Sequence, residues 1–199
     1  MNLQQRAAAL QQLGFFAPEE DLKALVQRAQ NVDGVDAKEA PATALLMAGG
    51  RLLEILADEA VELADYEVLL KKIETFCGGA FTVSDVSAEE MEEWVEEGEG
   101  EDEAEDAEDA EGEDFSFPVR LLFRVDGHAC EAHVTHGSDL VDLTFLTEID
   151  EALARKKESR RLCPLVELMD DTSRYVFIEP VKMDTAEEKD LFAAPDFEA

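Results

Sequence analysis

The chain has 199 residues, of which 46% are hydrophobic, and its 49 acidic residues against 17 basic ones give a formal charge of −32 at pH 7. A negative potential of this size repels phosphates, so we expect no direct binding to nucleic acid or to an anionic membrane surface. Because the chain is negatively charged, basic proteins and divalent cations are its natural electrostatic partners. No segment approaches the ~18 consecutive apolar residues of a membrane span.

The first 78 residues are predicted to form a small helical bundle. Residues 1–16 carry an apolar helical stripe and lack the basic start and continuous apolar stretch of a signal peptide. Pro18 is placed to open a second helix, and the leucines in 45–56 keep the spacing of a third. A last helix is expected from Asp65 to the glycine pair at 78–79.

Beyond these glycines the period of the apolar residues changes from 3.6 to 2. Residues 80–86 alternate in the manner of a short strand. Ser87 and Glu90 then have the spacing of a capping box, which predicts a short acidic helix. Its apolar face would either dock into a groove of a basic partner or pack on the protein's own sheet. The residues of that face are Met91, Trp94 and Val95.

Residues 89–114 contain 17 acidic residues in 26 positions and no Lys or Arg. A segment this charged cannot bury enough apolar surface to fold alone, so we predict a largely disordered insertion. Its spacing does not match a calcium-binding loop. We expect it to steer a cationic partner, the alternatives being a solvated spacer or a host-wide acidic bias, as in salt-adapted organisms. The predicted steering residues are Glu101, Asp102, Glu103, Glu105, Asp106, Glu108 and Asp109.

Residues 117–134 give the strongest local signal in the chain. Asp126-Gly127 is the favoured two-residue hairpin turn, and alternating runs flank it on both sides. A register with Val125 opposite His128 puts the apolar side chains of both strands on one face. On the other face, Glu131 lies near two arginines and can pair with them.

The last third of the chain is predicted to add a helix, a hairpin and a final helix. Residues 145–153 place their apolar side chains on one helical face, with acids at the start and bases at the end. Strands at 162–168 and 173–180 flank a turn, and Pro164 indicates that the first of them lies at a sheet edge. Thr185 and Glu188 have the spacing of a capping box for the final helix.

These elements together predict an α+β protein. A small N-terminal helical bundle (1–78) precedes an antiparallel sheet unit (79–88 with 115–199), whose element order from residue 65 is α-β-β-β-α-β-β-α. The acidic, largely disordered insertion (89–114) separates the first and second strands of this unit.

One basic cluster stands out against the acidic background, at the end of the helix over 145–153. It could bind a phosphate or clasp the acidic insertion, and ordinary matching of positive charge to the helix dipole is the simpler interpretation. Its residues are Arg155, Lys156, Lys157, Arg160 and Arg161.

The stretch 128–136 contains all three histidines and a cysteine, so a small metal-dependent enzyme is the alternative function. Its ligands would be His128, Cys130 and His136, which share one face of the predicted strand. Phosphate loops, nucleophile elbows, zinc-protease motifs and dinucleotide fingerprints are absent from the sequence, so we expect neither an enzyme nor a cofactor. The odd number of cysteines, without a C-x-x-C pair, favours a reducing compartment and a cytoplasmic protein.

The element order over about 65–194, with the small size and acidity, is similar to that of class I type III secretion chaperones. That resemblance is one of order only, and it implies an effector-binding protein that could pair into a homodimer. In size and charge the chain also resembles bacterial immunity proteins, which are acidic inhibitors of basic toxins. We therefore expect a non-enzymatic protein that binds and masks a basic partner protein. A nucleic-acid mimic that occupies a DNA-binding protein is a further alternative.

Overall fold

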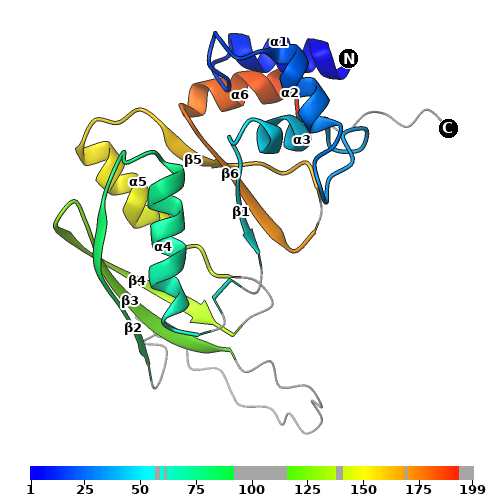
Figure 1. Ribbon diagram of the computed structural model, residues 1–199. Helices are drawn as coiled ribbons and strands as arrows, with labels where there is room; N and C mark the ends of the chain where they lie inside the picture. Colours follow the sequence, from blue (N-terminus) through cyan, green and yellow to red (C-terminus); the bar gives the residue numbers. More distant parts are fainter. Residues whose placement is uncertain (57–58, 61, 92–115, 138–140, 169, 193–199) are drawn as a thin grey trace, which may run out of the picture.

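The computed structural model describes residues 1–56, 59–60, 62–91, 116–137, 141–168 and 170–192 (Figure 1). Within these residues it has six helices and two three-stranded antiparallel sheets, which confirms the predicted α+β class. One sheet has the strand order β1-β6-β5 and the other β2-β3-β4. Among the described helices none is long and apolar enough to cross a bilayer.

Three short helices, α1 (Leu3–Gln12), α2 (Leu22–Ala29) and α3 (Pro41–Ala48), pack with α6 (Pro180–Glu188) at one end of the molecule (Figure 1). A capping box between Asn2 and Gln5 starts α1. The prediction that Pro18 opens the second helix is wrong. Asp21 is the N-cap of α2, because its carboxylate accepts hydrogen bonds from the N–H groups of Lys23 and Ala24.

The helix predicted through residues 45–56 is wrong in its second half, where the chain forms strand β1 (Leu53–Leu56). The helix ends at Gly49, and Gly50 follows with a φ of +62°. Leu53 and Ile55 are buried with Glu54 between them only half-buried, which is the period of a strand. Four residues are too few for a periodicity of 2 to stand out in the sequence.

The first sheet contains β1, β5 (Arg161–Pro164) and β6 (Thr172–Ile178), with β6 in the centre. The predicted edge position of Pro164 is confirmed. Both faces of this sheet are covered: Cys163, Val176 and Ile178 belong to the core under α1–α3 and α6, whereas Leu162 and Ile55 belong to the second core. The sheet is therefore the layer between two hydrophobic cores.

The second sheet contains β2 (Val83–Glu90), β3 (Phe117–Val125) and β4 (His128–His136). The predicted hairpin register is confirmed, with Val125 opposite His128. Asp126 and Gly127 both have positive φ, 51° and 81°, as a two-residue turn of this type requires. The predicted pairing of Glu131 with two arginines is half right: it contacts Arg120 at 2.8 Å, while Arg124 contacts Asp85 at 3.2 Å.

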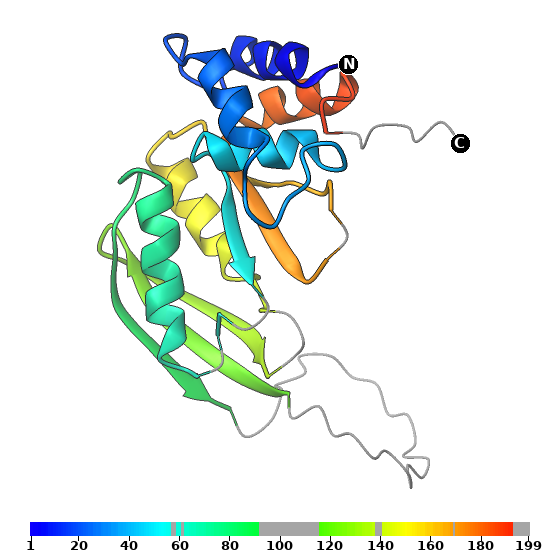
Figure 2. The same cartoon turned by 45° about the vertical axis from the view of Figure 1, so that its right-hand side comes forward.

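Helices α4 (Asp65–Phe76) and α5 (Leu146–Arg155) cover the apolar face of the second sheet (Figures 1 and 2). The expected stop at the glycine pair is confirmed, since Gly78 and Gly79 both have positive φ. The whole unit from α4 to α5 lies in sequence between β1 and β5 of the first sheet. The range 1–78 is thus divided between the two cores, because α4 packs in the second one.

Two predicted capping boxes are wrong. Ser87 and Glu90 lie within strand β2, where they pair with β3. Helix α6 begins at Pro180, the last residue of the predicted strand, because the fixed φ of proline suits the first helical turn. Thr185 therefore lies inside the helix, where its hydroxyl donates to the Val181 carbonyl at 2.7 Å.

Candidate functional site: the sheet edge beside the acidic segment

The acidic segment 92–115 joins the fold at one end of the second sheet. Strand β2 leads into it and β3 leads out of it, so its two ends are attached to neighbouring strands. The Met91 N–H donates to the Pro118 carbonyl at 2.9 Å, which continues the β2–β3 ladder to the last described residue before the segment. The segment has 15 acidic residues and no basic one, and it is attached to the described fold at this corner.

Most of the predicted partner-binding residues lie outside the described residues. These are Trp94 and Val95 and the steering residues from Glu101 to Asp109. Met91 is described and is partly buried beside Pro118. Because β2 continues to Glu90, Met91 follows a strand rather than lying on the predicted helix.

Strand β2 is itself acidic. Its sequence VSDVSAEE contains Asp85, Glu89 and Glu90 and no Lys or Arg, and all three carboxylates are exposed. By contrast, residues 116–137, which include β3 and β4, carry two arginines and two acids and have no net charge. The negative charge of the second sheet is therefore concentrated on one edge, and it continues into the acidic segment.

A cluster of rings lies beneath this end of the sheet. His136 is 6% exposed, with its ring centroid 5.0 Å from that of Phe117 and 5.8 Å from that of Tyr66. The Tyr66 hydroxyl lies 3.5 Å from His136 Nδ1. Burial, helped by the negative charge of Asp142, raises the pKa of Tyr66 to about 12. His136 is thus a packed core residue in a polar contact.

The three candidate metal ligands are not brought together. His128 and His136 stand at opposite ends of β4, eight residues apart, which is roughly 27 Å at ~3.4 Å per residue. Cys130 is buried opposite Phe123, and burial raises the pKa of its thiol. Metal ligands must converge on one point at about 2.0–2.3 Å, which this strand geometry does not allow. In the described part of the chain, no group of three or more His, Cys, Asp or Glu side chains could hold a metal ion.

The basic cluster is tied into the fold. Lys156 contacts Asp126 of the hairpin turn at 3.1 Å and donates to the Ala80 carbonyl at 2.7 Å. Arg160 pairs with Glu158 and lies 4.5 Å from the ring centroid of Phe177. Its hydrogen bonds lower the pKa of Glu158 to about 2. These contacts connect the end of α5 to both sheets, and a clasp between this cluster and the acidic segment remains a prediction.

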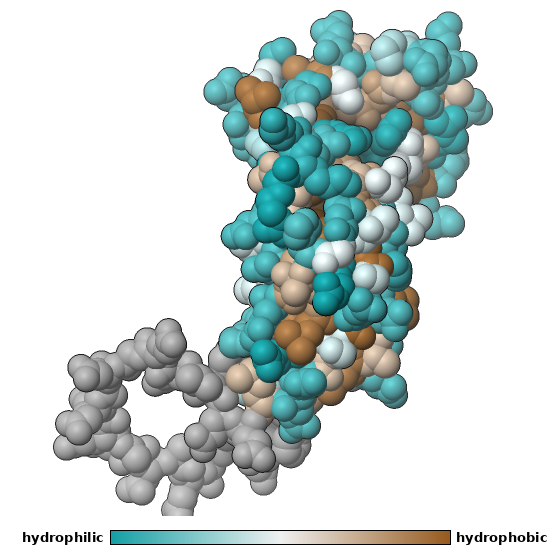
Figure 3. Space-filling view, turned by 90° about the vertical axis from the view of Figure 1, so that its left-hand side faces the viewer, coloured by the Kyte–Doolittle hydropathy of each residue, from teal (hydrophilic) through white to brown (hydrophobic). Residues whose placement is uncertain are grey.

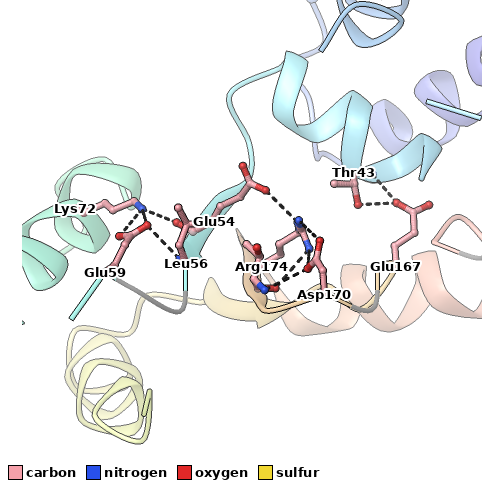
Figure 4. A network of polar contacts seen from close by, with 9 residues as sticks. Thr43, Glu54, Leu56, Glu59, Lys72, Glu167, Asp170 and Arg174 are labelled. Carbon is pink, nitrogen blue, oxygen red and sulfur yellow. Dashed lines mark hydrogen bonds and ion pairs between the residues drawn. The ribbon is translucent and has the colours of Figure 1, made fainter. Parts of the chain in front are cut away.

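A network of polar contacts connects strands β1 and β6 of the first sheet with helix α4, which covers the second sheet (Figure 4). No sequence motif predicts this network. Arg174 of β6 contacts Glu54 of β1 at 3.1 Å and Asp170 at 2.6 and 2.9 Å. From the other side of β1, Lys72 of α4 reaches Glu59 and the Glu54 carbonyl, each at 2.5 Å. Arg174 is only 7% exposed, so these pairs hold a buried cation in place.

A cleft of about 520 Å³ between α1, α4 and α6 is a second candidate. Arg51, Arg160 and Lys182 line it. Arg160 and Lys182 are already paired with Glu158 and Glu179, so their charges are largely neutralised. The C-terminal ends of α1, α3 and α4 also meet here, and their dipoles oppose an anion. The sheet edge beside the acidic segment is therefore the better candidate.

No family model, no curated protein and no solved structure matches this chain.

Proposed function

We propose that this protein binds and masks a basic partner protein in the cytoplasm, in the manner of an inhibitor, an immunity protein or a secretion chaperone, and that it is not an enzyme. One observation carries the proposal. The segment with 15 acids and no base is attached at both ends to neighbouring strands, and the β2 edge beside it is also acidic. A negative field of this kind raises the on-rate for cationic partners and rejects anionic ones.

The rest of the surface supports a polar mode of binding. On the face shown in Figure 3, hydrophilic side chains cover most of the surface and the hydrophobic ones form small separate groups. The large exposed apolar residues of the described part are also scattered along the chain. A broad apolar interface would need a contiguous patch, so charge and backbone contacts are the better source of affinity.

The cysteines support a reducing compartment. All three are buried and free, and burial raises the pKa of Cys77 to about 12 and that of Cys163 to about 11. Thiols of this kind are inert toward oxidants and metals, because the thiolate is the reactive form.

The experiment that tests this function is a capture from host lysate at about 50 mM and about 300 mM salt, a range over which surface charge interactions are increasingly screened. The intact protein is compared with a variant whose acids in 98–114 are replaced by Ser and Asn at constant length. A matched control shuffles the order of residues 98–114 and keeps the charge. Bound proteins are identified by mass spectrometry.

We expect one basic protein, captured at low salt by the intact and shuffled chains and lost from the neutral variant. A partner that ignores both salt and neutralisation would place the interface on the folded part alone. If DNA displaces the captured protein, the chain acts as a nucleic-acid mimic. The absence of any basic partner under all conditions would contradict the proposed function.

A further inference from the structure

The two sheets have four edge strands, and side chains are hydrogen-bonded to some of the outward backbone groups on each of them. On β1, the Glu54 carbonyl accepts from Lys72 at 2.5 Å and the Leu56 N–H donates to Glu59 at 3.2 Å. On β5, the Leu162 backbone is hydrogen-bonded to Asp150, and Pro164 has no N–H to offer. Neither edge of the first sheet can accept another strand without breaking these contacts.

On β4, the half near the acidic segment is closed as well. The Thr135 N–H donates to Asp142 at 2.8 Å, and Thr144 donates to the His133 carbonyl at 3.1 Å. Both groups point away from β3, because the hairpin register makes 128, 130, 132, 134 and 136 the residues that exchange hydrogen bonds with it. The free edge of β4 is therefore restricted to its first residues, next to the turn.

On strand β2 the hydrogen-bonded groups lie at the start of the strand, and the open groups lie at its end, close to where the acidic segment begins. The first residue of β2 is closed by α4: the Val83 N–H donates to Glu74 at 2.9 Å and the Val83 carbonyl accepts from Lys71. A bulge follows at Asp85, which has a φ of +53°. Beyond the bulge, Met91 bonds to Pro118, so by alternation Ala88 and Glu90 direct their N–H and C=O groups outward. No described residue is hydrogen-bonded to these outward groups.

We propose that the partner adds an extended basic segment to β2 as a fourth, antiparallel strand of the second sheet along residues 86–91. This inference rests on the proposed function and names the form of the partner. Strand addition supplies affinity through main-chain hydrogen bonds and specificity through alternate side chains.

The side chains beside the open edge define the sequence pattern of the occupant. In an antiparallel arrangement, residues opposite Ala88 and Glu90 exchange hydrogen bonds with them and share their face, where partly buried Ala88 packs on the core. Residues between these lie on the outer face, beside exposed Glu89. An alternation of apolar and cationic residues therefore fits the edge, with the cations on the outer face.

A second copy of this chain does not fit. Pairing β2 with β2 would set Asp85, Glu89 and Glu90 of each copy against one another. Like charges directly opposite on neighbouring strands are destabilising. A cationic segment meets the same carboxylates with the opposite sign.

The first test uses the full chain and an eight-residue peptide with alternating Lys and Val. Fluorescence anisotropy gives its Kd beside those of two backbone-methylated forms, one N-methylated at every Val and one at every Lys. The antiparallel register directs the Val N–H groups to β2, so we expect at least tenfold weaker binding of the Val-methylated form. The Lys-methylated form, with the same charge, should bind as the parent does.

A pair of proline variants tests the edge from the protein side. Ala88 and Ala129 both direct their N–H groups away from β3, so proline removes a ladder bond at neither position. We expect Ala88→Pro to weaken peptide binding at least tenfold and Ala129→Pro, on the β4 edge, to leave it unchanged. In the unmodified protein, saturating peptide should slow hydrogen exchange of the Ala88 and Glu90 amides at least tenfold and leave Ala129 unaffected.

The outcomes separate this inference from the proposed function. Salt-sensitive binding that Ala88→Pro and Val methylation leave unchanged would overturn strand addition and keep masking by charge. Failure of the peptide to bind would also overturn strand addition. The masking function would then be tested separately, by the capture experiment from lysate. A concentration-dependent dimer that Ala88→Pro abolishes would give the edge to a second copy and overturn the inference.

Discussion

A single carboxylate, that of Glu167, fixes the start of α3. It accepts hydrogen bonds from the Thr43 N–H at 2.6 Å, the Thr43 hydroxyl at 2.7 Å and the Ala42 N–H at 3.2 Å. Helix α3 has no side-chain cap of its own, so this distant residue accepts hydrogen bonds from the buried N–H groups of its first turn.

Replacement of Glu167 by Ala should therefore lower the free energy of unfolding by about 2–3 kcal/mol, because the buried donors of α3 lose a charged acceptor. Urea denaturation measures the change. Glu188→Ala, at the exposed end of α6, is the matched control and should stay within ~0.5 kcal/mol of the unmodified protein. Equal effects of the two substitutions would show that the cap does not hold α3.

The pair of Asp170 with Arg174 makes stability depend on pH. Hydrogen bonds from Arg174 lower the pKa of Asp170 in the folded protein. A carboxylate with a depressed folded pKa stabilises the fold above its unfolded pKa of about 3.9, and this contribution is lost as the pH falls through the folded value.

We expect Asp170→Asn to be less stable than the unmodified protein at pH 6, and the difference to shrink as the pH drops below about 4. Unfolding free energies measured from pH 6 to pH 2.5 follow this directly. Asp171→Asn, at the neighbouring exposed residue, is the matched control and should stay within ~0.5 kcal/mol of the unmodified protein at pH 6. A difference between the Asp170→Asn protein and the parent that stays constant across this range would contradict the assigned role.

Residues of this kind could not be identified from the sequence. Glu167 acts on Thr43 and Arg174 acts on Glu54, at separations of 124 and 120 residues, and only the folded chain brings them together. Met91, by contrast, was predicted on the apolar face of a short helix, and it follows strand β2 at the point where the acidic segment joins the sheet. The acidic composition of the sequence indicated this region as the candidate site. The open backbone groups of β2, however, could be identified only from the strand register in the folded protein.

At the scale of elements, the end of α3 depends on a close approach of Phe16 to Gly49. A Cβ at position 49 would lie 2.6 Å from Cε1 of Phe16, and the φ of Gly49, −90°, is one that any residue adopts. Gly49→Ala should thus destabilise the protein by steric overlap alone, by about 1–3 kcal/mol.

A double-mutant cycle isolates this contact. Phe16→Leu shortens the ring side chain, so the combined Gly49→Ala and Phe16→Leu protein should be more stable than the sum of the two single effects predicts. Gly34→Ala, where no atom lies within 4 Å of the added Cβ, should be additive with Phe16→Leu. Urea denaturation of the six proteins gives both coupling energies, and additivity at Gly49 would show that Phe16 does not oppose the added methyl.

The difference between the hairpin and β1 explains which elements the sequence predicts. The β3–β4 hairpin has nine-residue strands and a turn whose residues require positive φ, so pattern and turn chemistry agree. Strand β1 has four residues, and its leucines also fit a continuation of the helix before it. Its pairing with β6, over 110 residues away, determines its conformation.

At the scale of the whole molecule, the position of the first sheet between two cores ties the halves of the protein together. Alternate residues of β6 face opposite sides, Val176 toward α1–α3 and Phe177 toward the second core. Loss of either core would expose one face of this sheet to water at about 25 cal/mol per Å² of apolar surface. If either half of the protein unfolds, the shared sheet is exposed to water on one face, and the other half is destabilised.

We therefore expect a single cooperative unfolding transition. Leu46→Ala removes packing from the core under α3, and Ile73→Ala removes it from the core under α4. Each should cost about 2–5 kcal/mol and shift the same transition. Native-state hydrogen exchange in low denaturant supplies the site-specific readout, with amides of Leu45 in α3 and Leu121 in β3 as reporters. Both reporters should lose the same protection in either variant, since the shared sheet transmits the loss. If Leu46→Ala lowered protection at Leu45 alone, the halves would be independent, and a partner bound on β2 could not stabilise the helices at the far end of the molecule.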